Sequence, residues 1–352
     1  MKQIGFFDEA NALKRLSALG DKLEWLNAAI DWSMFLPLLN RAKPDRTQTP
    51  KGGRPPLHPL LMFKVVILQE LHNISDEEAE YQINDRLSWK RFLGLSLSDK
   101  APDRTSIWLF RETLKNSGVY EDLFDLFNAK MEALGVITHK GTIVDASFVD
   151  VPRQRNTREE NQTIKEGGVP EEWQVGGQAH MLSQKDFNAR WAMKGNERHY
   201  GYKDHILCDS ESKMILDYRV SAANLHDSQM LLSLLSFHGE KVNSLWADSA
   251  YLGEDIMSWV KDFFPNIAFQ ICEKGSRGKP LTDAQKLSNR EKSKTRARVE
   301  HVFGYITCSM GGMYIRSIGI KRACCKIALR NLVYNLTRYA TLRRLERVPS
   351  MV

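Results

Sequence analysis

Three carboxylates occupy positions where a charged side chain needs a partner. Asp145 and Asp248 each follow an apolar run in a segment predicted to be a strand, and Glu300 lies in the arginine-rich segment 294–305. A charge inside a buried strand is costly unless another group compensates it. A divalent cation can compensate several carboxylates at once. The three acidic residues therefore predict a site for metal-assisted chemistry.

Magnesium suits such a site because it binds a few carboxylates and keeps positions open for water and phosphate. Two ions about 4 Å apart can activate a water or a sugar hydroxyl and stabilise the leaving oxygen of a displacement at phosphorus. Asp145 and Asp248 from strands, with Glu300 from a helix, would provide the ligands. This donor set predicts phosphoryl transfer with Mg²⁺, for which Mn²⁺ can substitute.

Each acidic residue also has an ordinary structural explanation. An aspartate at the end of a strand can cap a turn. Arg296 and Glu300 are four residues apart in a segment predicted to be one helix, a spacing that often means a surface ion pair. The metal site is favoured because both aspartates occupy the same register in their apolar strands. Glu300 also lies in the most basic part of the chain.

The elements that must position these residues alternate between strands and helices. Apolar periodicity predicts strands at 141–149, 203–209, 214–220, 244–251 and 267–274, and helices at 226–237, 255–264 and 294–305. The second and third strands are joined by a short turn and form a hairpin. The segment 152–203 is polar and is predicted to be a long excursion with little core. This order predicts an α/β sheet with an antiparallel element at one side.

The N-terminal part is predicted to be all helical. Helical spacing covers residues 1–36, and a Pro- and Gly-rich linker follows at 43–59. Further helices are predicted at 57–72, 76–87, 103–118 and 120–134, with Ser75 and Asp103 as caps. These compact helices have helix-turn-helix proportions, and Arg104 and Arg111 lie where a recognition helix presents side chains to DNA. Any small helical bundle would show a similar pattern.

Charge is unevenly distributed along the chain. Residues 274–347 contain 18 Lys and Arg against 4 Asp and Glu, a net of +14, so the remainder carries −7. A basic C-terminal quarter favours a polyanionic partner such as DNA over a merely solvated surface. The 5 cysteines form no C-x-x-C pair, which argues against a zinc knuckle or a disulfide scaffold and favours a reducing cytoplasm. No apolar run is long enough to predict a membrane span.

The motifs together resemble those of bacterial insertion-sequence transposases of the DDE type, in the IS-four/IS-five superfamily. GTIVDASFVDVP, LWADSAYLG and RARVEHVFG resemble the three acidic motifs of that group, in order and about 100 and about 50 residues apart. SQKDFNARW, HYGYKDH and AANLHDSQ are also similar to segments of this group, as are GRPPLHPLLMFKVVILQEL and APDRTSIWLFR. The resemblance covers most of the chain.

The resemblance implies an RNase H-like fold, with a mixed five-stranded sheet flanked by helices and preceded by an all-α N-terminal domain. Asp145 and Asp248 would lie on the first and fourth strands, and Glu300 on a C-terminal helix. We expect a helical segment at 1–42, the linker at 43–59, a helix-turn-helix-like domain at 60–136, a catalytic domain at 137–310 with a polar insertion at 152–203, and a basic helical region at 311–352.

The resemblance also implies an activity. Such an enzyme binds the terminal inverted repeats of its element, cleaves the ends, and joins the 3′-hydroxyls to target DNA. Asp145, Asp248 and Glu300 would be the catalytic and metal-binding residues, with Mg²⁺ as cofactor. Double-stranded DNA would be the partner, a homodimer would form in the synaptic complex, and the protein would be cytoplasmic and associated with the nucleoid, without a membrane.

Basic and aromatic residues elsewhere are predicted to contact DNA. The set is Arg104, Arg111, Arg190, Trp191, Lys194, Lys203, His205, Arg296, Arg298, Lys321, Arg322 and Lys326. Trp191 with its basic neighbours would suit a flipped base or a strand end, although a place in the local core is an alternative of at least equal weight. Lys203 and His205 could instead be satisfied at a strand edge. Arg330 and Arg338 would extend a phosphate-tracking face on the last helix.

The sequence departs from the group's glutamate signature at two positions. Arg296 and Glu300 are present, but Ser293 and Thr307 stand where many relatives carry tyrosine and lysine. The roles of those two side chains at DNA ends therefore do not transfer to this chain. Two other functions fit the same residues: an RNase H-like nuclease without strand transfer, and a domesticated DNA-binding regulator without catalysis.

Overall fold

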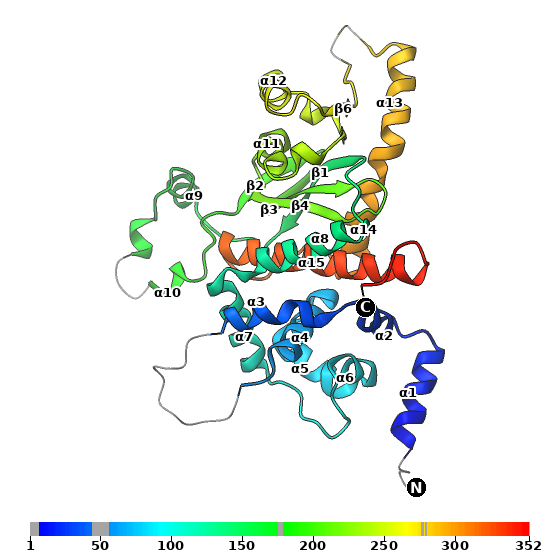
Figure 1. The fold of residues 1–352 in the computed structure, drawn as a ribbon. Coiled ribbons are helices and arrows are strands. Elements are labelled where there is room, and N and C mark those ends of the chain that lie inside the picture. The colour runs from blue at the N-terminus through cyan, green and yellow to red at the C-terminus, as the bar shows by residue number, and fades with distance from the viewer. Residues whose placement is uncertain (1–6, 44–55, 175–178, 276–277, 279, 352) are drawn as a thin grey trace. The chain divides into compact units, whose positions relative to one another are not determined.

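The computed structural model describes residues 7–43, 56–174, 179–275, 278 and 280–351 (Figure 1). The chain divides into two compact units. The first contains the described residues up to Ile137, then Cys308–Gly311 and the chain from Ala328 onward; the second contains Thr138–Thr307 and Gly312–Ile327. The predicted linker 43–59 falls largely on residues 44–55, which lie outside the described part of the chain.

The first unit is helical. Asp103 caps α7 by accepting a hydrogen bond from the Ser106 amide at 2.9 Å, and Ser75 caps α5 through the Glu78 amide at 3.1 Å. The helices are α1 (Asp8–Ala18), α2 (Lys22–Ala29), η1 (Trp32–Phe35), α3 (Leu36–Arg41), α4 (Pro59–His72), α5 (Asp76–Asp85), α6 (Leu87–Leu93), α7 (Arg104–Ser117), α8 (Val119–Ala133) and the later part of α15 (Ile320–Arg344). No helix in the described ranges is both long and apolar enough to cross a bilayer.

A buried ion pair joins α4 to α15 within this unit. Arg330 Nε donates to Glu70 Oε1 at 2.7 Å, and both side chains are fully buried. The expectation that Arg330 would track phosphates is therefore wrong, because its guanidinium has no exposed surface. The apolar residues predicted for the core of this helix are all buried: Ile327, Leu329, Leu332, Val333 and Leu336.

The second unit is built on a mixed sheet whose centre is β1 (Thr142–Asp150). The strand β3 (Glu197–Asp209) lies antiparallel to β1 on one side, and β4 (Ile215–Ala222) continues antiparallel to β3. On the other side β5 (Ser244–Ala247) and β6 (Ala268–Ile271) run parallel to β1. These five strands have the RNase H-like arrangement that was expected. A sixth strand, β2 (Arg190–Lys194), pairs with the start of β3.

Helices cover both faces of this sheet (Figure 1). Arg219 on β4 shares a face with its partner His205 and donates to Ser233 of α11 (Leu231–Leu235) at 3.0 Å, so α11 covers that face. Asp145 points to the opposite face, because it is adjacent to Ala146, the residue that pairs with His205. The end of α13 (Asp283–Arg296) reaches Asp145 there.

The polar segment 152–203 contains more regular structure than expected. It holds α9 (Arg158–Lys165), η2 (Glu171–Trp173), α10 (Ala179–Leu182) and β2, and β3 begins at Glu197 rather than at Lys203. The hairpin of β2 and β3 was missed because its residues are mostly polar and exposed. Such a sequence lacks the apolar alternation from which strands are predicted.

Replacing Glu70 with Leu should lower the free energy of unfolding by about 3–5 kcal/mol, because Arg330 would remain charged and without its carboxylate in the core. The double variant Glu70→Leu/Arg330→Met should recover most of this loss, since it leaves no buried charge. Urea unfolding followed by circular dichroism measures both. Equal losses in the single and double variants would contradict this account of the ion pair.

Candidate active site

Asp145 lies in the middle of β1 and is mostly shielded from solvent. Its side chain is 22% exposed, its Oδ1 accepts a hydrogen bond from the Ala146 amide at 2.8 Å, and Arg296 Nη1 lies 3.7 Å from its Oδ2. The neighbouring strand β3 places Ile206 directly opposite. The sequence therefore puts a carboxylate in a central strand with one backbone donor and one distant cation as compensation.

The pKa of Asp145 is raised from 3.8 to about 6, and burial is the largest cause. The negative charge of Asp248 also raises this pKa, while the Ala146 amide, Arg296 and Lys194 lower it. Burial has this effect because a carboxylate loses hydration in the sheet. Asp145 is thus a carboxyl group whose ionised form is disfavoured by burial and by the charge of Asp248.

The register of β1 and β5 explains why the two aspartates are neighbours. Thr142 pairs with Leu245 and Ile143 with Trp246 in parallel. Asp145 and Asp248 each lie two residues beyond the second pair. Asp248 is also the N-cap of η6 (Ser249–Tyr251), and its Oδ1 accepts the Ala250 amide at 2.8 Å. Both interpretations of Asp248 hold, since it caps a turn and adjoins Asp145.

Glu300 is placed differently from what the sequence suggested. The helix expected over 294–305 is interrupted, because α13 ends at Arg296, a 3-10 turn η7 (Ala297–Val299) follows, and α14 (Glu300–Ser309) starts at Glu300. Arg296 accordingly approaches Asp145 instead of pairing with Glu300. Glu300 is exposed, and the three predicted ligands do not converge within 4.8 Å among the described residues.

The chemistry of the aspartate pair fits a divalent cation. Two adjacent carboxylates repel each other, and one of them is poorly hydrated, so a cation between them would relieve both costs. Their oxygens are the ligands that Mg²⁺ prefers. The structure thus brings Asp145 and Asp248 together and leaves Glu300 at the start of a neighbouring helix.

Lys194 reaches the surroundings of Asp145 from the insertion. It pairs with Glu197 at the end of the β2–β3 hairpin and acts to lower the pKa of Asp145. Gly201 in β3 has a φ of +151°, and a Cβ there would lie 2.2 Å from the Val149 carbonyl oxygen, so the close approach of β1 to β3 requires glycine at this position. Lys194 is exposed and remains a predicted DNA contact.

Trp191 borders a polar cavity of about 780 Å³ within the insertion. Its ring is 47% exposed, lies at 5.0 Å from the Tyr200 ring, and is covered on one side by Arg153 at 5.4 Å. Arg190 lines the same cavity, but its guanidinium donates to three backbone carbonyls, those of Phe187, Ala189 and Ile164. Trp191 is thus available to a ligand, whereas Arg190 mainly stabilises the insertion.

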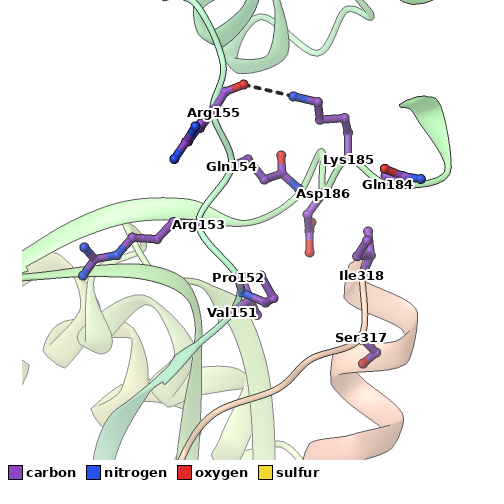
Figure 2. Close-up of a pocket in the computed structure, with 10 residues that line it drawn as sticks. All are labelled: Val151, Pro152, Arg153, Gln154, Arg155, Gln184, Lys185, Asp186, Ser317 and Ile318. Atoms are coloured by element: carbon purple, nitrogen blue, oxygen red, sulfur yellow. Dashed lines mark hydrogen bonds between the residues drawn. The ribbon is translucent and has the colours of Figure 1, made fainter. Parts of the chain in front are cut away.

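Asp186 was not singled out from the sequence and proves to be the anchor of the insertion. It is 3% exposed and accepts hydrogen bonds from the Tyr202 hydroxyl and from the amides of Asn188, Ala189 and Gly319. Figure 2 shows it beside a smaller cavity of about 350 Å³, with Lys185 turned toward the Arg155 carbonyl oxygen at 3.2 Å. Its position in the SQKDFNARW motif was the available signal.

Lys203 and His205 are not surface residues of the DNA-binding kind that we expected. His205 has 0% exposure and its Nε2 lies 2.7 Å from Ser221 Oγ, so the predicted DNA contact is wrong for this side chain. Burial also lowers the pKa of His205 to about 4, which keeps it neutral. Lys203 is 9% exposed and is paired with Asp227. Both residues therefore match the alternative interpretation, in which their polar groups are satisfied by partners within the protein.

The start of α7 has a more acidic setting than a recognition helix usually has. Arg104 lies 3.8 Å from Glu77, and Arg111 lies 2.7 Å from Asp76 in a partly buried pair. Both acidic residues belong to the first turn of α5. Arg104 remains exposed, and Trp108 beside it is 49% exposed. DNA contact by Arg104 and Arg111 stays a prediction, and the Asp76 pair holds the Arg111 guanidinium between two helices.

The other predicted DNA contacts are distributed over the second unit. Arg298 is exposed and donates to the Ser210 carbonyl at 2.9 Å, whereas Arg296 is 26% exposed beside Asp145. Lys321 and Arg322 are exposed on the first turn of α15, and Lys326 is half-buried. These side chains stay candidates for phosphate contacts.

Comparison with known proteins identifies the two parts of the chain. Residues 137–336 match the family model described as "Transposase DDE domain", and residues 11–113 match one described as "Transposase domain (DUF772)". Among solved structures, a cryo-EM structure of a piggyBac transposase synaptic complex with hairpin DNA aligns with a TM-score of 0.46 and 10% identity, over 96% of this chain and 79% of that chain. At that score the alignment has no bearing on the site.

The raised pKa of Asp145 makes a prediction about stability. Between about pH 4 and pH 6 the folded chain holds a proton on Asp145 that the unfolded chain has lost, so stability falls as pH rises through this window. Asp145→Asn removes the ionisable group. Without metal, this variant should exceed the wild type in free energy of unfolding by up to about 3 kcal/mol at pH 7.5, and by little at pH 4.

Urea unfolding in EDTA at several pH values measures this difference. The matched control is Asp283→Asn, whose side chain is 98% exposed and should show no such window. A wild type that gains stability over the variant between pH 4 and pH 6 would contradict the assignment.

Proposed function

The chain belongs to the family of DDE transposases, and we propose that it binds the terminal inverted repeats of an insertion sequence, cleaves the ends, and joins the 3′-hydroxyls to target DNA. The observation that supports this most is the adjacent pair Asp145 and Asp248, held on β1 and directly after the parallel strand β5 of an RNase H-like sheet. Divalent metal ions serve the family in general, and Mg²⁺ suits these oxygen ligands, with Mn²⁺ as a substitute.

In the proposed site, Asp145 and Asp248 would hold the cations, and Glu300 would be the third ligand. When bound, Mg²⁺ supplies a lowered pKa for the attacking water or hydroxyl and compensates the charge on the leaving oxygen. The carboxylates of the chain fix the positions of these charges. Neither aspartate acts as a nucleophile, so no covalent intermediate with the protein is required. The same site serves cleavage by water and joining by a 3′-hydroxyl.

Several side chains would hold the DNA beside these carboxylates. Lys194 influences Asp145 electrostatically and is exposed, so it suits a phosphate next to the reacting one. Trp191 offers a half-exposed ring beside a polar cavity, which suits an unstacked base or a strand end. Lys321 and Arg322 would bind backbone phosphates farther along the duplex. A homodimer is proposed because two ends must be cut and joined together.

Substituting Asp145 or Asp248 by Ala should reduce cleavage at least about 1,000-fold, because each removes charge that holds the cation. Binding of the DNA end should remain within a few-fold of wild type. The assay uses labelled DNA that carries the ends flanking the gene, with Mg²⁺ or with EDTA, and scores nicked and joined products. Loss of binding without a specific loss of cleavage would count against the site.

The same assay separates the rival activities. Nicking without joined product would indicate a nuclease that lacks strand transfer. Binding with no cutting in either condition would indicate a DNA-binding regulator, and would remove the catalytic role proposed for Asp145, Asp248 and Glu300.

Lys321→Gln should weaken binding of all DNA sequences alike and reduce the slope of log affinity against log salt by about 1, because one phosphate contact is lost. Fluorescence anisotropy at a series of salt concentrations measures the slope. Lys286→Gln is the control, since that exposed lysine pairs with Asp283. An unchanged slope for Lys321→Gln would exclude it from the DNA interface.

A further inference from the structure

Lys203 is a buried cation that fastens a loop to the sheet. Its Nζ donates to the Leu225 carbonyl and to Asp227 Oδ1, both at 2.7 Å, and lies 5.1 Å from the centre of the Phe148 ring. A buried ammonium is costly unless its hydrogen bonds are satisfied. Its two acceptors come from one short segment, so the lysine holds that segment against β1 and β3.

The fastened segment supports the turn that carries Asp248. Asp227 begins the 3-10 helix η4 (Asp227–Met230), and η4 packs against η6. The N-cap of η6 is Asp248, whose carboxylate accepts the Ala250 amide. A displacement of η4 would therefore shift η6, the turn that orients the Asp248 side chain.

Tyr251 ends η6 and brings these groups together. Its side chain is 1% exposed, and its hydroxyl has no hydrogen-bond partner among the described residues. Burial raises the pKa of Tyr251 well above its ordinary value, and the charges of Asp145, Asp227 and Asp248 raise it further. The phenol thus experiences the charges of both candidate ligands and of the partner of Lys203, and it keeps its proton as a donor.

We propose that Lys203, Asp227 and Tyr251 are positioning residues that hold the Asp248 carboxylate in the orientation that binds a divalent cation. This inference rests on the proposed function, because it assigns support to the same site. Lys203 compensates the charge of Asp227, which would otherwise add to the negative charge of the two aspartates. In this proposal the Tyr251 hydroxyl, which has no hydrogen-bond partner among the described residues, donates toward the Asp248 carboxylate. Groups that orient metal ligands change metal affinity by about 10–100-fold when removed.

The test measures Mn²⁺ binding to the full chain without DNA, from the electron paramagnetic resonance signal of free Mn²⁺. Tyr251→Phe removes only the hydroxyl, and Lys203→Met removes the cation with little change in shape. Both should weaken Mn²⁺ binding by about 10–100-fold. Lys203→Arg should recover much of the affinity because it can donate to the same acceptors. The affinity for the DNA end should stay unchanged in all three variants.

Arg219→Met provides a matched control on the neighbouring strand. Arg219 pairs with Asp217 and donates to Ser233 of α11, which follows η4 directly, so this variant loosens the same helical segment without removing a contact of Lys203, Asp227 or Tyr251. A general loss of packing should lower the melting temperature of this variant while leaving its Mn²⁺ affinity at the wild-type value. Thermal unfolding of every variant is recorded in parallel.

The outcomes separate the inference from the proposed function. Wild-type Mn²⁺ affinity in Tyr251→Phe would overturn the inference, even if Lys203→Met does not fold. Losses of affinity matched by Arg219→Met would overturn it as well, because they would reflect stability alone. Mn²⁺ binding that Asp248→Asn leaves unchanged would overturn it too. A wild type that binds Mn²⁺ through Asp248 but never cuts DNA would refute the proposed function and leave the positioning intact.

Discussion

The parallel register of β1 and β5 is the constraint on which the site depends. Two residues beyond the paired Ile143 and Trp246 lie Asp145 in β1 and Asp248 directly after β5, so the backbone itself brings like charges together. The repulsion and the loss of hydration are visible in the raised pKa of Asp145. The sheet is held by many other pairings, and it can therefore maintain an arrangement that is locally unfavourable. The local cost creates a place where a cation is stabilising.

The carboxylate of Asp186 stabilises the insertion. The segment after β1 is polar and has little apolar core of its own, so it needs polar fastening. Asp186 provides it, because one buried side chain accepts from a β3 tyrosine, from two amides of its own loop, and from Gly319 before α15. Asp145 and Asp186 are both shielded from solvent, but Asp186 is saturated with donors whereas Asp145 is not. That difference separates a structural carboxylate from one that suits a ligand.

The features that could be predicted from the sequence are those with local causes. The caps at Ser75 and Asp103 depend on amides three residues away, and the apolar strands depend on alternation within each strand. The RNase H-like order of strands followed from the three acidic motifs and their spacing. The adjacency of Asp145 and Asp248 followed from their equal offset in two such strands.

The features that escaped prediction depend on distant partners or weak local signals. Arg330 is buried because Glu70, 260 residues away, neutralises it. His205 is covered by α11, and the sequence around His205 carries no sign of that helix. The break at Ala297–Val299 contains neither glycine nor proline, so nothing in the sequence separated Arg296 from Glu300. The strand β2 is polar, and only its pairing with β3 makes it a strand.

The strand pairings that position the two aspartates do not involve the insertion between β1 and β2. Residues 151–189 leave the sheet after β1 and return as β2, which pairs with β3 alone. The register of β1 with β3, from Asp150↔Gly201 to Thr142↔Asp209, involves none of those residues. A longer, shorter or exchanged insertion would leave the alignment of the two aspartates as it is. The position of the two aspartates is thus set by β1 and β5, and the insertion contributes side chains such as Lys194 to their surroundings.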